Sequence, residues 1–181
     1  MWLKKLPLPK KNPDTMMSFW KPKFPAVLLL LAVSTLFAAC GGNKSAVFAG
    51  DSEPEAFMLS FQKPETFTFD IAEAGSYDFA IELTYYSEQM QNMDGQVPMY
   101  YILEGPGMGD GKDRKFAMRV SQEGEWLGEL MENEHDRIVE EIFEEDMQLE
   151  AGQYSFKLYA DSSNEGEPVQ GIVRITFKVY Q

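Results

Sequence analysis

From about residue 57 onward, apolar and polar positions alternate along most of the chain. Such alternation, rich in aromatic and β-branched residues and interrupted by Gly, Pro and Asn clusters, is typical of strands that bury one face. The residues expected to face inward are Phe57, Leu59 and Phe61; Phe67, Phe69 and Ile71; Tyr77, Phe79, Ile81, Leu83 and Tyr85; Phe116, Met118 and Val120; Tyr154, Phe156 and Leu158; and Val173, Ile175, Phe177 and Val179. Asp78, Glu82 and Thr84 are expected on the opposite face, and VPMYYIL (97–103) is a further strand. The pattern predicts an all-β fold, an antiparallel β-sandwich of about seven or eight strands.

One segment, HDRIVEEIFEEDM (135–147), breaks this alternation. Its apolar residues follow the spacing of one helical face, with glutamates on the other side: Ile138, Val139, Ile142, Phe143 and Met147. The flanking sequence is otherwise all strand. Two alternatives therefore stay open, a short helix near 136–146 and a bent edge strand.

A short internal repeat supports the predicted fold. EAGSYDFAI (73–81) and EAGQYSFKL (150–158) share Glu, Ala, Gly, Tyr and Phe at the same places. We expect Gly75 and Gly152 to supply a positive φ at a turn that leads into each strand.

The only cysteine, Cys40, ends the most apolar run of the chain, AVLLLLAVSTLFAAC. Six lysines precede this run, which is shorter than the ~20 residues of a membrane-spanning helix. A basic segment, a short apolar run and small residues before a cut are the order of a secretory signal. The segment resembles the bacterial lipoprotein signal, in which the cysteine receives a diacylglyceryl group and becomes the first residue, although Phe37 stands where that family prefers Leu. The resemblance implies that Cys40 is a lipidation site.

This interpretation divides the chain into three parts. Residues 1–39 are the expected signal peptide, and two alternatives stay open for its beginning: a true start at Met16 or Met17, or an unusually long basic region. Residues 40–55 are a flexible tether, because they are small and polar, and residues 56–181 are the β-sandwich domain. Lipidation would leave the mature protein without a free thiol and would anchor it to a membrane.

The charge balance changes when the signal is removed. The whole chain has 29 acidic and 16 basic residues, and the first 39 residues hold one aspartate and six lysines. The remaining 28 acidic and 10 basic residues carry a formal charge of −18. Phosphates would repel such a domain, which argues against nucleic acid as a partner.

Candidate chemistry is sparse. The single histidine, His135, lies in NEHDR without a recognisable catalytic context, and no serine has a G-x-S-x-G context. The glycine-rich EGPGMGDGKDR (104–114) lacks GK[ST], so a phosphate cradle is not expected. Glu104, Asp110 and Asp113 are weak calcium candidates, because hard oxygens suit that ion but their spacing fits no EF-hand. We predict no catalytic residues, no enzyme activity and no cofactor.

Trp126 is the only tryptophan after Cys40 and lies between Gly124 and Gly128. On the rim of a sandwich, such a ring could contact a sugar or a partner protein. The alternative is that Trp126 closes one end of the core. Its burial therefore helps to separate ligand binding from a structural role.

Most of the chain after Cys40 resembles the gliding-motility lipoproteins of the GldH type. The resemblance rests on the lipoprotein cysteine followed in order by FTFDIAEAGSYDFAIEL, GEWLGE, EAGQYSFKL and EPVQGIVRITFKVY. The best-matched positions are Phe69, Tyr77, Trp126, Gly128, Gly152, Tyr154, Gly171 and Ile172. Residues 85–101 depart from the family, which has a short tyrosine-asparagine-leucine segment there. The resemblance implies an outer-membrane lipoprotein of the Bacteroidetes gliding apparatus, with no catalytic role.

Two functions follow from these observations. The first is a noncatalytic accessory of a gliding or related envelope machine, anchored by lipid on Cys40, facing the periplasm and acting through protein-protein contacts. The second is a membrane-tethered sandwich that binds carbohydrate or calcium. A buried Trp126 with an exposed apolar patch or a free strand edge favours the first function, and an exposed Trp126 beside polar groups favours the second.

Overall fold

The computed structural model describes residues 44–90, 94–109, 111–161 and 167–181. Cys40 and Asp110, on which two of the sequence predictions depend, lie outside these ranges. Within them, the chain forms a compact unit from Lys44 to Gln181. In this described part, no helix is long and apolar enough to cross a membrane.

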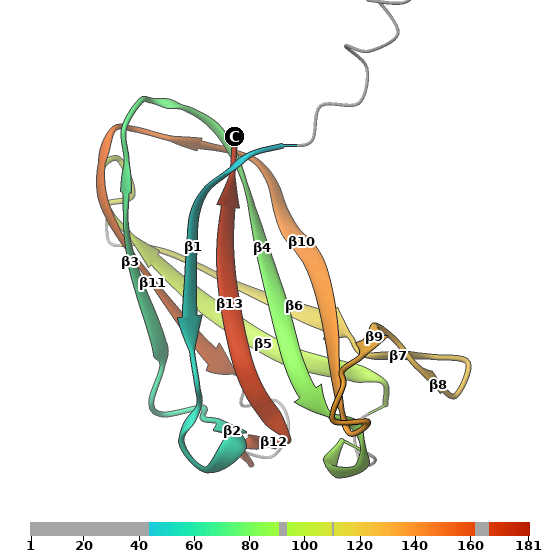
Figure 1. Cartoon of the computed structure of the whole chain (residues 1–181). Helices are drawn as coiled ribbons and strands as arrows, with labels where there is room; N and C mark the ends of the chain where they lie inside the picture. Colours follow the sequence, from blue (N-terminus) through green and yellow to red (C-terminus); the bar gives the residue numbers. More distant parts are fainter. Residues whose placement is uncertain (1–43, 91–93, 110, 162–166) are drawn as a thin grey trace, which may run out of the picture. The chain divides into compact units, whose positions relative to one another are not determined.

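Two antiparallel sheets make up the domain (Figure 1). The five-stranded sheet has the order β1 (Ala46–Ser52), β13 (Ile172–Tyr180), β4 (Gly75–Tyr86), β10 (Asp136–Leu149) and β9 (Glu129–Leu130). The four-stranded sheet has the order β3 (Glu65–Ile71), β11 (Gly152–Ala160), β5 (Gln96–Glu104) and β6 (Lys112–Arg119). Short pairs join β2 (Met58–Leu59) to β12 (Val169–Gln170) and β7 (Ser121–Gln122) to β8 (Glu125–Trp126), and single 3-10 turns lie at η1 (Glu55–Phe57) and η2 (Ser87–Gln89). The predicted all-β sandwich is confirmed.

The core lies between the two sheets and is rich in aromatic rings. Phe156 of β11 stacks in parallel on Phe177 of β13, with ring centroids 4.1 Å apart. Phe79 of β4 packs edge-on against both rings. The predicted inward-facing residues of β4 are all buried, because strict alternation places them on one face: Tyr77, Phe79, Ile81, Leu83 and Tyr85.

The segment with helical spacing is a strand, so the helix alternative for 136–146 is wrong. β10 pairs with β4 from Asp136 to Leu149, and its register shifts between Ile142 and Glu144 and again between Glu144 and Met147. A β-bulge adds residues to one strand and moves the following side chains to the other face. Ahead of the first bulge, ordinary alternation places Phe143 on the inner face and Ile142, which is 43% exposed, on the outer face. The helical spacing is only apparent, because Ile138 and Ile142 lie on the outer face while Val139, Phe143 and Met147 lie on the inner face.

The N-terminal boundary also differs from the prediction. Residues 46–52, expected within a flexible tether over 40–55, form the edge strand β1 and pair with β13. Only Phe48 gives β1 a large inward-facing ring, which contacts Phe69 at 5.4 Å and Phe177 at 6.1 Å. The sequence did not predict this strand, because small side chains fill most of its other positions and give little apolar-polar alternation. The folded domain therefore includes residues that precede 56.

At the other predicted boundary, the strand expected over 57–61 shrinks to β2. Leu59 is buried as expected, but Phe57 is 54% exposed at the end of η1.

Asp78 also departs from its expected solvent exposure. It does lie on the outer face of β4, yet it is only 3% exposed, because Lys44 and the bulged Asp146 cover it.

The repeated EAG-x-Y segments have a common structural explanation. The Tyr77 hydroxyl donates a hydrogen bond to the carbonyl oxygen of Glu73, at 2.6 Å, and the Tyr154 hydroxyl lies 3.1 Å from the carbonyl oxygen of Glu150. Each tyrosine thus bonds to the glutamate that begins its own repeat. Gly152 has the expected positive φ of 143°, whereas Gly75 does not adopt a positive φ.

Candidate interaction surface

The calcium candidates do not come together as a cation site. The carboxylate of Glu104, at the end of β5, accepts hydrogen bonds from the Lys157 amine at 2.8 and 2.9 Å. Asp113 is exposed on β6, and Asp110 is outside the described residues. Among the residues that the structure describes, no group of three or more His, Cys, Asp or Glu side chains is placed to hold a metal ion.

Trp126 is half-buried and packs against one end of the core. Its ring centroid lies 6.2 Å from that of Tyr85, and the Tyr85 hydroxyl bonds to the Leu127 carbonyl at 2.7 Å. Burial raises the pKa of Tyr85. The Arg137 guanidinium donates to the carbonyls of Trp126 and Gly128 at 3.4 and 3.2 Å. These contacts hold the β7–β8 hairpin against the sandwich, with Trp126 partly exposed and packed against the end of the core.

His135 lies in an exposed turn that Asn133 organises. The Asn133 side-chain oxygen accepts hydrogen bonds from the backbone N–H groups of His135 and Asp136, at 3.1 and 3.0 Å. The imidazole is perpendicular to the Tyr86 ring, with centroids 6.0 Å apart. The contacts of His135 are those of a surface turn and an aromatic neighbour, and none joins it to a nucleophile.

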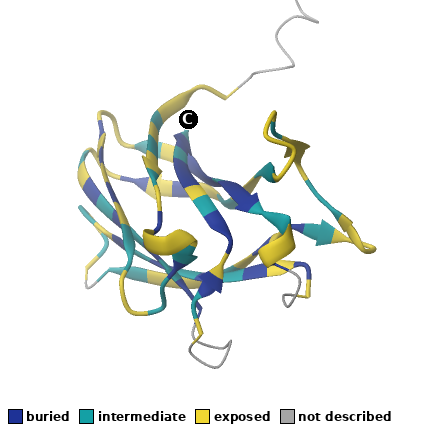
Figure 2. Cartoon of the chain, turned by 60° about the horizontal axis from the view of Figure 1, so that its bottom comes forward, coloured by how far each residue is buried: buried dark blue, intermediate teal, exposed yellow. Residues whose placement is uncertain are grey.

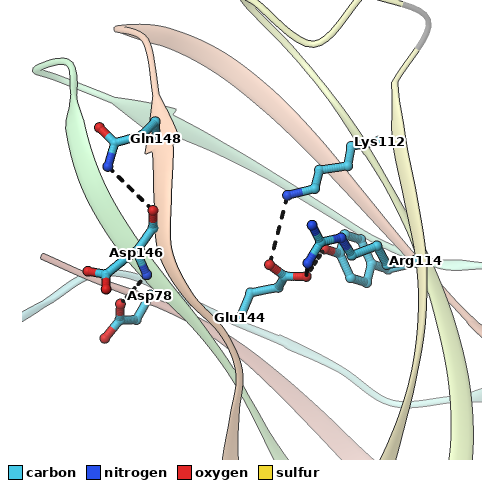
Figure 3. A network of polar contacts seen from close by, with 7 residues as sticks. Asp78, Lys112, Arg114, Glu144, Asp146 and Gln148 are labelled. Atoms are coloured by element: carbon cyan, nitrogen blue, oxygen red, sulfur yellow. Dashed lines mark hydrogen bonds and ion pairs between the residues drawn. The ribbon is translucent and has the colours of Figure 1, made fainter.

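A polar cluster joins β10 of the five-stranded sheet to β6, the edge strand of the four-stranded sheet (Figure 3). Glu144 lies in the bulged part of β10 and accepts hydrogen bonds from the Tyr101 hydroxyl at 2.9 Å and from Arg114 at 2.5 Å. The Lys112 amine lies 3.8 Å from its other oxygen. Burial, together with the bond to Glu144, raises the pKa of Tyr101. All the charged members are paired with one another, and the cluster is best understood as a closure between two sheet edges.

A mainly apolar groove lies at the end of the sandwich that Figure 2 brings forward. It encloses about 190 Å³, and its walls come from four separate segments: Phe57, Tyr86, Gln89, Asp136, Gly171 and Val173. Sequence reasoning missed this groove because it placed Phe57 in the core. The local sequence carries no signal for an assembly of residues so far apart in the chain.

The backbone beneath Phe57 is held in an unusual conformation. Ala56 and Phe57 have φ values of 55° and 58°, in the left-handed region that costs an L-residue roughly 1–2 kcal/mol. Two backbone hydrogen bonds hold Phe57 there: its N–H donates to Pro54 at 3.0 Å, and its carbonyl accepts from Gly171 at 2.9 Å. We call the six groove residues together with this turn the Phe57 groove.

The floor of the Phe57 groove requires a glycine. Gly171 has a φ of 84°, and a Cβ atom there would lie 3.0 Å from the Gln89 Cβ and 3.1 Å from the Tyr86 carbonyl oxygen. The backbones of β4 and β13 approach closely at this point, because the Tyr86 N–H donates to the Gly171 carbonyl at 2.8 Å. At Gly171 the groove is therefore built on backbone.

Negative charge borders the Phe57 groove. The Tyr86 hydroxyl donates to a carboxylate oxygen of Glu88 at 2.7 Å, and Asp136 forms part of the wall. The hydrogen bond to Glu88 raises the pKa of Tyr86, with smaller contributions from burial and from the charges of Glu88 and Asp136. The groove thus combines an apolar floor with a negative border.

Comparisons with known proteins do not identify a relative. No protein-family model matches the chain, and no curated protein matches it significantly.

Proposed function

We propose that the protein is a noncatalytic bacterial envelope lipoprotein, anchored through lipid on Cys40 and acting through protein-protein contacts. We place it on the periplasmic side of the outer membrane, as an accessory of a gliding-motility machine of the GldH type or of a related envelope assembly. The observation that carries the proposal is the order of lysines, short apolar run, small residues and Cys40. The fold that follows is compatible with a role in binding rather than catalysis.

The start of the domain supports this arrangement. β1 begins at Ala46, six residues after Cys40, and six extended residues span at most about 20 Å. A lipid on Cys40 would therefore keep the first strand near the bilayer. Such tethering raises the local concentration of the domain for partners in the same membrane without any new contact.

The contacts of the candidate residues favour this proposal over a carbohydrate- or calcium-binding sandwich. Trp126 packs on Tyr85, and Glu104 is bound to Lys157. By contrast, an exposed apolar ring at a groove is a common feature of protein-protein contacts. The exposed ring here is Phe57.

The experiment that tests the anchor is metabolic labelling with a palmitate analogue. We expect label in the wild type and none in Cys40→Ser. A double variant, Cys40→Ser with Ser45→Cys, keeps one thiol but moves it out of the signal, and should stay unlabelled. Equal labelling of all three chains would refute the lipoprotein proposal.

The experiment that tests the role is crosslinking in the native envelope, followed by identification of the crosslinked proteins. We expect specific envelope partners for the anchored chain and their loss for Cys40→Ser, because the released domain loses its local concentration. Deleting the gene should disturb the same assembly, and gliding is the first phenotype to measure where the organism glides. Turnover of a glycan, ester or peptide by the purified protein would contradict the noncatalytic proposal.

A further inference from the structure

Phe57 differs from the other exposed large hydrophobic residues of the described chain. Val47, Leu130 and Ile142 are also more than 40% exposed, but they lie in strands with ordinary backbone angles. Phe57 lies in the left-handed region at φ 58°, where glycine or asparagine would adopt the same turn at lower cost. The turn does not need an aromatic ring, and at 54% exposure the ring contributes only partly to the core. A strained, exposed side chain that its surroundings hold in place points to a role outside folding.

The chemistry around this ring selects the kind of ligand. The Phe57 and Tyr86 rings and Val173 offer apolar and aromatic surface, and Asp136 and Glu88 add carboxylates beside it. An arginine or lysine carries an aliphatic stem with a cationic head, and that head is attracted both to carboxylates and to aromatic faces. The domain as a whole is strongly acidic, with −18 from Cys40 onward, which would also attract a basic segment.

The cations near the groove do not neutralise it. Lys63 is paired with Glu55 at 3.0 Å, and Arg137 donates to the carbonyls of Trp126 and Gly128. Arg174 follows Val173 on β13, where it pairs in register with Thr84. Among the described residues, Lys63 and Arg137 are thus engaged elsewhere, while Asp136 and Glu88 lie beside the groove.

The groove also lies at a suitable place in the domain. It contains Gly171 and Val173 at the start of β13, while the other end of β13, at Tyr180, pairs with Ala46 at the start of β1 (Figure 1). A nine-residue strand is about 30 Å long. The Phe57 groove is thus at the end of the sandwich opposite the point where the chain enters from Cys40.

We infer that the Phe57 groove binds a segment of a partner envelope protein in which an arginine or lysine stands beside an apolar residue. This inference rests on the proposed function, because it names the contact site of the accessory domain. The apolar residue would cover Phe57 and Val173, and the cation would lie between Tyr86 and Asp136.

The first test uses defined peptides and the full lipoprotein in detergent micelles. The probes are fluorescein-labelled peptides with Arg-Leu-Arg, Arg-Gly-Arg or Glu-Leu-Glu between glycines, and binding is followed by fluorescence polarisation. We expect saturable binding of the Arg-Leu-Arg peptide, weakened about tenfold or more in the other two, as loss of a central contact gives. Equal binding of the three peptides, or saturable binding of none, would overturn the inference.

Matched variants locate the site. Phe57→Gly removes the ring and suits the left-handed backbone, and Asp136→Asn removes the charge but keeps the shape. Both should weaken binding of the Arg-Leu-Arg peptide, Phe57→Gly by about tenfold, whereas Val47→Ala, an exposed residue at the other end, should leave it unchanged. Thermal unfolding of each variant checks that the fold is intact. Unchanged peptide binding by Phe57→Gly would overturn the inference. A wild-type protein that is dimeric and becomes monomeric in Phe57→Gly would also overturn it, because a second copy of the chain would then occupy the groove.

The envelope experiment separates this inference from the proposed function. We expect Phe57→Gly to lose crosslinks that Val47→Ala keeps. If Phe57→Gly keeps every crosslink while Cys40→Ser loses them, the accessory function stands and the Phe57 groove is not its contact site. If the wild type forms no specific crosslink, the proposed function itself fails.

Discussion

The pairing of β10 as a strand makes a sharp prediction about two neighbouring residues, Ile142 and Phe143. In the structure, Phe143 points between the sheets and stacks on Phe116, with ring centroids 4.4 Å apart and planes inclined by 15°. It also contacts the rings of Tyr101 and Phe79 at 5.4 and 6.3 Å. Ile142 points to the outer face and is 43% exposed. Truncating the two side chains should therefore have unequal effects.

The expected magnitudes follow from burial. A fully buried Phe→Ala change costs about 3–5 kcal/mol, and Phe143 is only partly buried, so we expect Phe143→Ala to lower the free energy of unfolding by about 2–3 kcal/mol. For Ile142→Ala, lost strand propensity and a little lost packing give about 1 kcal/mol or less. An amphipathic helix would instead place both residues on one buried face and make their losses similar.

Urea unfolding of the chain from residue 41, followed by circular dichroism, measures both losses. The double variant Phe116→Ala, Phe143→Ala gives the coupling between the stacked rings, which we expect to be roughly 0.5–1.5 kcal/mol. Equal losses for Ile142→Ala and Phe143→Ala, or a coupling near zero, would refute the strand register of β10.

Three further predictions concern the core, a glycine and a carboxylate. Phe79→Ala should lower the free energy of unfolding by about 3–5 kcal/mol, because Phe79 is fully buried between the sheets. Glu82→Ala should lower it by about 1 kcal/mol at most, since Lys178 keeps its bond to Glu140, and comparable losses in urea unfolding would show that the register of β4 is wrong. Gly128→Ala should destabilise the domain far more than Gly124→Ala, although the two glycines have similar φ values of 85° and 87°. The reason is that a Cβ at 128 would lie 2.1 Å from the Ile138 carbonyl oxygen, whereas one at 124 meets nothing within 4 Å, and equal urea midpoints of the two variants would contradict this packing. The hydrogen bond from Lys44 lowers the pKa of Asp78 below its ordinary 3.8, so the stability that Asp78 contributes is present above that pH and is lost as the pH falls through the folded-state pKa. Asp78→Asn should therefore be less stable than the wild type at pH 7 and approach the wild-type stability in strong acid. A stability difference that does not change with pH would refute the pairing of Asp78 with Lys44.

The sequence predicted those elements in which side-chain alternation is uninterrupted. β4 is the best example, because its five inward residues from Tyr77 to Tyr85 repeat with a period of two and are all buried. β10 was ambiguous for a physical reason: its outer face carries the apolar Ile138 and Ile142 beside the inward-facing Val139 and Phe143, and apolar residues on both faces imitate a helical period. β1 was missed because, apart from Phe48, it offers little apolar contrast.

The groove could not be predicted from local pattern. Its residues come from η1, the end of β4 with η2, the start of β10, and the start of β13 with the glycine before it, and only the sheet order brings these segments together. The alternation of Phe57, Leu59 and Phe61 also misled, since it assumes extended backbone where the chain makes a left-handed turn at Ala56 and Phe57. The signal peptide and Cys40 remain predictions from sequence, because they lie outside the described residues.

The positions that carry the GldH-type resemblance have structural roles within the described domain. Tyr77 and Tyr154 bond to their own turns, and Gly128 and Gly171 have positive φ values where a side chain would meet backbone. Trp126 packs against the end of the core. Any sandwich with these turns would need these residues whatever it binds, so they carry no information about a partner. Under the proposed function, a partner would be recognised by other residues, and Phe57, which folding does not require at its strained position, is the residue at which to look for that contact.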